Sequence, residues 1–128
     1  MVTIAELWQN KHQEDSRGSI DRYYRDDGTA EARVFTRKGF FRGGEVHLCD
    51  QSHVILSGKA CFTTYENGED VERIYHAGDI VEIPAGVPHL FEALEDTVFT
   101  EVYHGEFDGS TYYQRYRDIV AQRMVKKE

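Results

Sequence analysis

The stretch of sequence that decides the fold is Gly78-Asp79-Ile80-Val81-Glu82-Ile83-Pro84-Ala85-Gly86-Val87-Pro88-His89. Gly78 can turn the chain into a short strand, and Pro84 with Gly86 can shape a tight reversal. We expect His89 to begin the next strand with its side chain facing inward. A histidine on such a rigid element can bind a metal ion. The stretch therefore predicts a strand, a turn and a second strand that starts at an imidazole.

Turn signals divide the sequence on both sides of this stretch into short extended segments. Asp26-Asp27-Gly28 separates Ser19–Arg25 from Ala30–Thr36, as a hairpin turn does. Asn67-Gly68 is the strongest short hairpin signal in the chain. Further strands are expected at Val54–Leu56, Ala60–Tyr65, Val71–Tyr75, Ile80–Ile83, His89–Leu94 and Thr97–Tyr103. Strands this short, with frequent turns, indicate a small antiparallel barrel or sandwich.

Helical patterns are confined to the two ends of the chain. Thr3 and Glu6 have the spacing of a capping box, which predicts a short helix from about Ile4 to Asn10. A second, amphipathic helix is expected at about 110–126, behind Asp108-Gly109-Ser110. Its apolar stripe consists of Tyr112, Tyr113, Tyr116, Ile119, Val120 and Met124. We expect this stripe to be a docking face that covers one mouth of the barrel or a partner subunit.

Composition and charge exclude several classes of protein. The chain has 128 residues and is 40% hydrophobic, which suits one globular domain and argues against intrinsic disorder. Its formal net charge of -8 is the opposite of what a duplex-binding domain needs. Seven of the fifteen Lys and Arg residues fall between Arg17 and Arg42, so we expect any anionic ligand to meet that segment.

Nothing in the sequence predicts a membrane or an oxidising compartment. No apolar run approaches the roughly 20 residues of a membrane span, and the N-terminus does not read as a signal peptide. Two cysteines, Cys49 and Cys61, cannot form a disulfide framework. We therefore expect a soluble, cytoplasmic protein.

The stretch from Gly78 to His89 resembles the second signature of the cupin superfamily, G-x5-P-x-G-x2-H, at all four fixed positions. The first signature, G-x5-H-x-H-x3-E-x6-G, can be counted from the glycine at position 39. Its five positions fall on Gly39, Glu45, His47, Gln51 and Gly58. The resemblance implies an all-β, single-domain cupin, a jelly-roll β-barrel flanked by the two helices. The domain would span residues 1–128, with a barrel core at about 17–106.

The cupin resemblance implies a metal site. Glu45, His47 and His89 would supply one carboxylate and two imidazoles, with Gln51 as a weak fourth ligand. Glu45 and His47 share a strand face because side chains alternate along a strand. This set suits a divalent transition metal such as Zn, Fe, Mn or Ni. The alternative is a cupin that has lost its metal. His53 either lines the same pocket or is a hydrogen-bonded core histidine.

Two further resemblances point towards carbohydrate. Asp15-Ser16-Arg17-Gly18 and Lys38-Gly39-Phe40-Phe41-Arg42-Gly43 resemble segments of deoxysugar-nucleotide epimerases and ketoisomerases. That resemblance implies that Arg42 helps to hold a nucleotide diphosphate, whereas Glu45 stands where those enzymes have a histidine. Small cupins that process uronate sugars can place glutamine at the position of Gln51. Their last strand resembles Glu101-Val102-Tyr103.

We therefore expect a cupin isomerase or epimerase that acts on a carbohydrate or sugar acid. A bound metal, or Arg42 in its place, would polarise a sugar carbonyl. Glu45 or Glu101 would move the proton on the adjacent carbon, and if the metal occupies Glu45, then Glu101 or His53 becomes the base. The alternatives are a non-haem Fe(II) dioxygenase that uses the same ligands and a non-catalytic sugar-binding cupin. By analogy with other small barrels we expect a homodimer.

Overall fold

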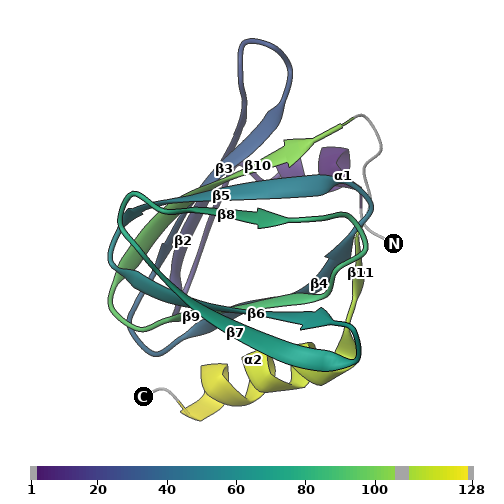
Figure 1. Cartoon of the computed structure of the whole chain (residues 1–128). Helices are drawn as coiled ribbons and strands as arrows, with labels where there is room; N and C mark the ends of the chain where they lie inside the picture. Colours follow the sequence, from purple (N-terminus) through teal and green to yellow (C-terminus); the bar gives the residue numbers. More distant parts are fainter. Residues whose placement is uncertain (1–2, 106–109, 127–128) are drawn as a thin grey trace.

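A computed structural model describes residues 3–105 and 110–126, with side chains as far as residue 122. The described chain is almost entirely strand and turn, with one helix near each end (Figure 1). Its elements are α1 (Ile4–Trp8), β1 (His12–Asp15), β2 (Gly18–Tyr24), β3 (Ala30–Thr36), β4 (Phe41–His47), β5 (Asp50–Ser57), β6 (Lys59–Glu66), β7 (Glu69–His76), β8 (Ile80–Ile83), β9 (His89–Ala93), β10 (Thr97–His104), β11 (Ser110–Tyr112) and α2 (Gln114–Lys126).

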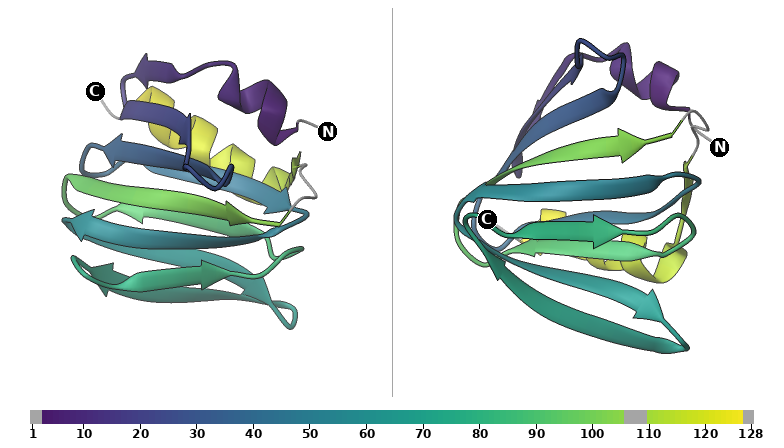
Figure 2. Two further views of the ribbon diagram at one scale, coloured as in Figure 1. Left: turned by 90° about the horizontal axis from the view of Figure 1, so that it is seen from above. Right: turned by 45° about the horizontal axis from the view of Figure 1, so that its top comes forward.

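The strands form two antiparallel sheets that face each other across a shared interior (Figure 2). The six-stranded sheet has the order β1-β2-β3-β10-β5-β8, and the five-stranded sheet has the order β11-β4-β9-β6-β7. Strands that are distant in sequence are therefore neighbours, as when β10 lies between β3 and β5. This jelly-roll arrangement confirms the expected all-β fold.

Both hairpin turns lie where the sequence predicts them. β2 and β3 are joined through Asp26-Asp27-Gly28, and β6 and β7 through Asn67-Gly68. Asn67 and Gly68 have φ angles of 51° and 81°. Positive φ at both central residues is the geometry of a type I′ turn, whose twist matches that of the flanking strands. The local signal for this hairpin was therefore sufficient.

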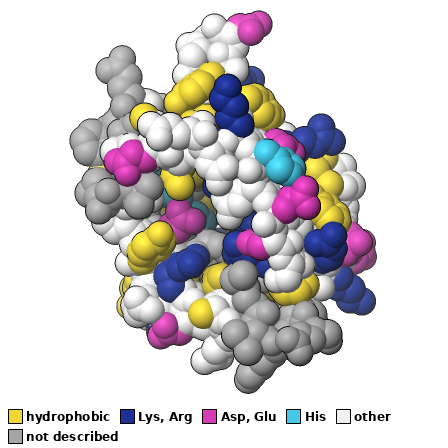
Figure 3. Space-filling model, turned by 180° about the vertical axis from the view of Figure 1, so that it is seen from behind, with side chains coloured by type: hydrophobic (Ala, Val, Ile, Leu, Met, Phe, Trp, Pro, Cys, Tyr) yellow, Lys and Arg dark blue, Asp and Glu magenta, His cyan; other side chains and the backbone are white. Residues whose placement is uncertain are grey.

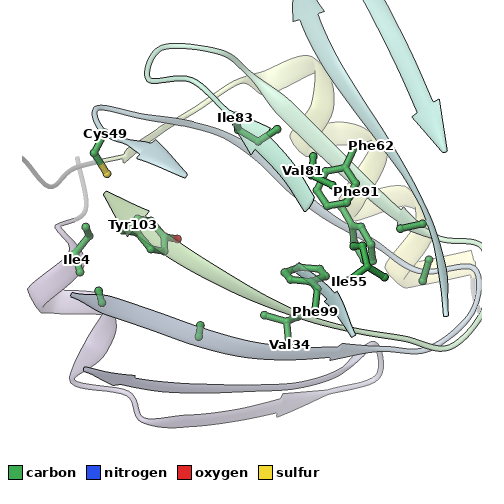
Figure 4. Close-up of a cluster of buried hydrophobic side chains, with 14 of the residues drawn as sticks. Ile4, Val34, Cys49, Ile55, Phe62, Val81, Ile83, Phe91, Phe99 and Tyr103 are labelled. Atoms are coloured by element: carbon green, nitrogen blue, oxygen red, sulfur yellow. The ribbon is translucent and has the colours of Figure 1, made fainter. Parts of the chain in front are cut away.

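An apolar cluster fills one part of the interior. Phe62, Phe91 and Phe99 contact one another edge to face or tilted, with ring centres 5.0 to 6.2 Å apart. Ile55 and Val34, which are 0% and 2% exposed, pack in the same cluster (Figure 4). Tyr103 lies apart from these rings in that view, toward α1. The interior is thus closed by hydrocarbon on one side, and polar side chains occupy the rest of it.

The C-terminal helix covers the outside of the barrel. Tyr116 and Val120 of α2 pack with Phe41 and Leu90 on the outer face of the five-stranded sheet (Figure 1). The expectation that this helix covers a barrel mouth was wrong, because Phe41 and Leu90 present an apolar surface on the outer face that α2 buries. The Asp108-Gly109 turn and the side chain of Met124 lie outside the described residues.

The N-terminal helix begins as expected but is shorter. Thr3 caps it by accepting a hydrogen bond from the backbone N–H of Glu6 at 3.1 Å. It ends at Trp8, two residues earlier than expected, because the chain then extends into β1. Neither helix, among the residues described, is long and apolar enough to cross a membrane.

Candidate active site

Strand register brings Glu101 and His53 together on the inner face of the six-stranded sheet. Glu101 of β10 pairs with His53 of β5 on one side and with Ala32 of β3 on the other. Ala32 in turn pairs with Arg22 of β2. Directly paired residues of antiparallel strands point to the same side of a sheet. Arg22, Ala32, Glu101 and His53 therefore form one row of inward-facing positions.

A second row faces the first from the five-stranded sheet. Glu45 of β4 pairs with His89 of β9, and His89 pairs with Thr64 of β6. His47 lies two residues after Glu45 and so projects from the same face of β4. Four strands separate β4 from β9 along the chain, yet they are adjacent in the sheet. The strand register thus places His47 and His89, which belong to different sequence motifs, on adjacent strands.

A β-bulge in β4 turns both Arg42 and Glu45 toward the interior. The pairing of β4 with β9 shifts between Gly43 and Glu45, and the φ angles of Gly43 and Gly44 are 102° and 78°. Residues with a side chain rarely adopt such angles. In addition, a Cβ on Gly43 would lie 2.9 Å from the carbonyl oxygen of His89. Glycine at this position therefore permits the bulge that aims Glu45 into the site.

The Arg42 guanidinium connects the two sheets. Its Nε donates to Thr36 Oγ1 at 2.7 Å and its Nη2 donates to the carbonyl oxygen of Phe35 at 3.1 Å. Burial lowers the pKa of Arg42 to about 10, so the group keeps its charge at neutral pH. These hydrogen bonds hold Arg42 against β3, and its charge acts on Glu101 without a direct contact.

His47, His89 and Glu45 form the first part of the site. The rings of His47 and His89 are centred 5.3 Å apart, and His47 Nε2 lies 3.4 Å from Glu45 Oε2. Burial lowers the pKa of each histidine to about 4, and for His89 the nearby His47 adds to the effect. Both imidazoles are therefore neutral at pH 7, which is the form that binds metals. Burial raises the pKa of Glu45.

The tautomer of His89 follows from its backbone contact. His89 Nδ1 lies 3.2 Å from the carbonyl oxygen of Val87, which can only accept a hydrogen bond. We assign the proton of the neutral ring to Nδ1 on this basis. Nε2 then presents its lone pair to the interior, as a metal ligand requires.

Glu101 and His53 form the second part of the site. His53 Nε2 lies 3.2 Å from Glu101 Oε2, and the His53 side chain is only 3% exposed. Burial raises the pKa of Glu101, but the hydrogen bond and charge interaction with His53 outweigh it, so the pKa is lowered overall. Glu101 is therefore an ionised carboxylate that accepts from His53. The other ring nitrogen, Nδ1, is buried without a hydrogen-bond partner among the described residues.

Gln51 and Tyr103 line the interior next to the two parts of the site. Gln51 of β5 pairs with Tyr103 of β10, so both face the interior beside Glu101. Gln51 is 1% exposed, and neither its Oε1 nor its Nε2 has a hydrogen-bond partner in the described part of the chain. Tyr103 places its ring edge to face against His47, with centres 5.2 Å apart. A buried amide without partners is costly, so it points to a missing ligand or water.

The four candidate ligands are of the chemical kinds that bind a divalent ion, but their side chains would have to move in order to coordinate one. Two neutral imidazoles, a carboxylate and the unpartnered amide of Gln51 are ligands that first-row metals accept. The 3.4 Å between His47 Nε2 and Glu45 Oε2 is close to the separation of two donors on one ion. Among the described residues, however, no three His, Cys, Asp or Glu side chains converge closely enough to hold an ion as they stand. Binding of an ion would therefore require movement of His89 or Glu45.

Cavities lie against three walls of this site. One of about 490 Å³ is bounded by Tyr103, α1 and the β2–β3 hairpin, and one of about 270 Å³ by Gln51 and its neighbours on β8. A third, also about 270 Å³, is lined by Phe62 and Thr64. The space-filling view shows a recess on the far side of the molecule from Figure 1, where charged side chains of both signs gather (Figure 3). None of these three cavities is lined by Glu45, His47, His53, His89 or Glu101.

The structure brings together six of the seven site residues expected from the sequence. Around one interior lie Glu45, His47, Gln51, His53, His89 and Glu101. Arg42 is buried nearby but bonds to β3. Sequence reasoning missed Arg22, which joins the row of Glu101. The alternation of Ile20, Arg22 and Tyr24 along β2 is the signal that could have placed Arg22 on the inner face.

Known proteins resemble this chain in structure and not detectably in sequence. The sequence matches no family model and no curated protein. A variant of Bacillus subtilis oxalate decarboxylase superposes with a TM-score of 0.71 and 21% identity, over 95% of this chain and 35% of that chain. CapF of Staphylococcus aureus, a capsular polysaccharide assembling protein, superposes with a TM-score of 0.61 and 23% identity, over 75% of this chain and 28% of that chain.

These likenesses establish the fold alone, because the identities are low. The chain spans about a third of the length of the oxalate decarboxylase structures that it matches. The activities of those larger proteins therefore do not pass directly to this one.

Proposed function

Because the chain has the cupin fold, we propose that it is a metal-binding cupin enzyme that moves a proton next to the carbonyl of a small carbohydrate or sugar acid. The observation that carries this proposal is the Glu101–His53 pair, an ionised carboxylate held at 3.2 Å by a buried imidazole beside the metal-ligand candidates. A positioned carboxylate within an enclosed site is the arrangement of a general base.

The metal would be held by Glu45, His47 and His89, with Gln51 as fourth ligand. One of the structural relatives is Bacillus subtilis oxalate decarboxylase, a protein with Mn(II) centres. This likeness supports our proposal that the present chain binds a divalent transition metal. When bound, such an ion acts as a Lewis acid toward a carbonyl oxygen. Glu45 is then occupied as a ligand, which leaves Glu101 as the carboxylate available to accept a proton.

The chain's own residues set up the proton transfer. His53 donates to Glu101 Oε2, which leaves Oε1 of the same carboxylate to take a proton from the substrate carbon. The Phe99 ring packs edge to face against His53, the partner of Glu101, and the Glu101 side chain is 19% exposed. Arg42 adds positive charge near Glu101 and favours its ionised form.

Hydrogen exchange with solvent tests this function directly. The purified protein, loaded in turn with Mn(II), Zn(II), Fe(II) or Ni(II), is incubated in D2O with D-glucuronate, D-galacturonate, D-glucose and D-fructose. Deuterium at the carbon next to the carbonyl is followed by NMR. We expect incorporation with at least one of these sugars, and a loss of about 100-fold or more in Glu101→Gln with metal content unchanged.

The surface histidine His104 provides the matched control. His104→Gln removes a histidine that is exposed and bonded to Ser52, so exchange should stay at the wild-type rate. Exchange that persists in Glu101→Gln would show that another group is the base. Oxygen uptake by the Fe(II) protein without any deuterium exchange would instead identify an oxygenase.

A further inference from the structure

The arginines of this chain divide into two groups by their partners. One group forms ion pairs with carboxylates at 2.5 to 3.7 Å and consists of Arg17, Arg25, Arg73 and Arg115. Among the described residues the others have no such ion pair. Of these, Arg33 and Arg37 are exposed, whereas Arg22, Arg42 and Arg117 are partly or fully buried. These three arginines, which are at least partly buried and form no ion pair among the described residues, are cations that act electrostatically on Glu45 or Glu101.

Neutral oxygens hold the two arginines at the rim of the site. Arg22 donates to the carbonyl oxygen of Asn10 at 3.0 Å and to Gln13 Oε1 at 3.1 Å. Arg117 donates to the carbonyl oxygen of Gly43 at 2.7 Å. A guanidinium carries five N–H donors. These contacts therefore orient each group while leaving both its charge and further donors for a ligand.

Arg22 and Arg117 come from different elements, β2 of the six-stranded sheet and α2 on the outside of the five-stranded sheet. Arg22 lies in the same cross-strand row as Glu101, two strands away, or about 10 Å. Arg117 reaches from α2 to the edge of β4, which β11 covers only from Glu45 onward. Both arginines act electrostatically on the Glu45 carboxylate. Arg117 is thus bonded to the chain two residues before Glu45, and Arg22 lies in the row of the opposite sheet that contains Glu101.

The charges at this place do not cancel. Arg22, Arg42 and Arg117 contribute three positive charges, whereas the two carboxyl side chains of the site, Glu45 and Glu101, can contribute no more than two negative ones. The whole chain, by contrast, has a net charge of -8. Charged side chains of both signs also gather at the recess in the surface view (Figure 3). Local positive excess in an acidic protein attracts anions to that place.

We propose that the ligand of this site carries an oxyanion, a carboxylate or a phosphate, that Arg22 and Arg117 bind. The guanidinium fork matches both groups in geometry. The inference rests on the proposed function only in placing the ligand in the barrel interior. It does not require the metal, since both arginines are held by the protein chain itself.

Trp8 offers a direct readout of binding at Arg22. It is the only tryptophan in the chain, and the Arg22 guanidinium lies 5.8 Å from its ring centre. Metal-free protein at low ionic strength is titrated with D-glucuronate, glucose 6-phosphate, inorganic phosphate, the neutral methyl ester of glucuronate and D-glucose, and Trp8 fluorescence is recorded. We expect saturable changes with an acid probe and a dissociation constant at least tenfold higher for the matched neutral sugar.

Two variants and a control assign the effect to the named residues. Arg22→Gln and Arg117→Gln should each weaken binding of the acid probe by about tenfold to 100-fold. Arg33→Gln removes an exposed arginine and should bind as the wild type does. Because Arg117 does not contact Trp8 in the described structure, its effect is also measured by isothermal titration calorimetry. A stronger response to glucuronate than to glucose 6-phosphate identifies a carboxylate ligand, and the reverse a phosphate.

The outcomes separate this inference from the proposed function. Equal affinity for glucuronate and its methyl ester, unchanged affinity in Arg22→Gln and Arg117→Gln, or no response to any acid probe overturns the inference, even if the protein binds metal and exchanges protons. Arginine-dependent binding of an acid by protein that never takes up metal supports the inference and contradicts the metal-dependent function.

Discussion

Glu101 and His53 lie directly opposite each other on β10 and β5, and His53 Nε2 is 3.2 Å from Glu101 Oε2. His53 also packs edge to face against Phe62 and Phe99, at 5.2 and 5.1 Å between ring centres. The imidazole thus joins the apolar cluster to the polar part of the interior. Its hydrogen bond is what keeps a carboxylate ionised in that position.

Removal of His53 should therefore destabilise the fold as well as the site. His53→Ala leaves Glu101 without its partner and opens a cavity beside Phe62, so we expect a loss of about 3 kcal/mol in the free energy of unfolding. Urea denaturation measures this loss. His104→Ala, on the exposed end of β10, should change stability by less than about 1 kcal/mol. Equal effects of the two variants would contradict the buried pair.

Stability of the metal-free protein should fall as the pH falls from about 6.5 to 4. His47 and His89 have pKa values of about 4 in the folded state and 6.5 ordinarily. The unfolded chain therefore binds more protons in this interval, and unfolding is favoured. For each histidine, this pKa difference corresponds to at most about 3 kcal/mol in the free energy of unfolding. That stability is fully present above pH 6.5 and is lost as the pH falls to 4. The raised pKa of Glu45 opposes this trend in part.

Urea denaturation at a series of pH values, with EDTA present, tests this pH dependence. In the double variant His47→Gln/His89→Gln the slope between pH 6.5 and 4 should be clearly smaller than in the wild type. An unchanged slope would mean that other groups cause the acid sensitivity and that these imidazoles are not buried as the structure places them.

Gly18 should tolerate no side chain. It has a φ of 141°, and a Cβ there would lie 2.2 Å from the backbone oxygen of Phe35. Because that neighbour is backbone within a sheet, we expect Gly18→Ala to cost about 3 kcal/mol or more. Gly28→Ala is the matched control, since its φ of 86° is strained but its Cβ would meet nothing within 4 Å. It should cost only about 1–2 kcal/mol in the same thermal or urea measurement.

Shortening Val120 should weaken the fold without touching the metal site. Val120 of α2 is 0% exposed and packs with Phe41, Leu90 and Tyr116 on the outside of the barrel. Val120→Ala should cost about 2 kcal/mol, whereas Gln122→Ala, on the exposed side, should stay within about 0.5 kcal/mol. Metal content should be the same in both. A loss of less than about 0.5 kcal/mol in Val120→Ala would contradict the burial of this side chain between α2 and the sheet.

Local signals in the sequence predict much of this fold. The Asp-Asp-Gly and Asn-Gly turns depend only on backbone preferences of adjacent residues, and both hairpins form there. Glu45 and His47 share a face because of strand alternation alone. Their proximity to His89 was predicted from the spacing of the two motifs. It depends on strand pairing, which no local pattern in the sequence encodes.

Features that depend on register and packing could not be predicted in this way. Arg22 lies in the row of Glu101 only because β2, β3 and β10 are neighbours in a particular register. The position of α2 depends on Phe41 and Leu90, which lie far from it in sequence. Similarly, the charge of Arg42 suggested a ligand-binding role. Its hydrogen bonds with Thr36 and Phe35 form only because the two sheets approach each other, which the local sequence does not predict.

The central claim is that His47 and His89 bind a metal together with Glu45, and metal content tests it most directly. Wild-type protein and His89→Ala are purified without chelator, incubated with Mn(II), Zn(II), Fe(II) or Ni(II), desalted, and measured by mass spectrometry of the elements. Circular dichroism confirms that both are folded. We predict one tightly held divalent ion per wild-type chain and none in His89→Ala. A wild-type protein that retains no metal, or a folded His89→Ala that retains as much as the wild type, would contradict the account.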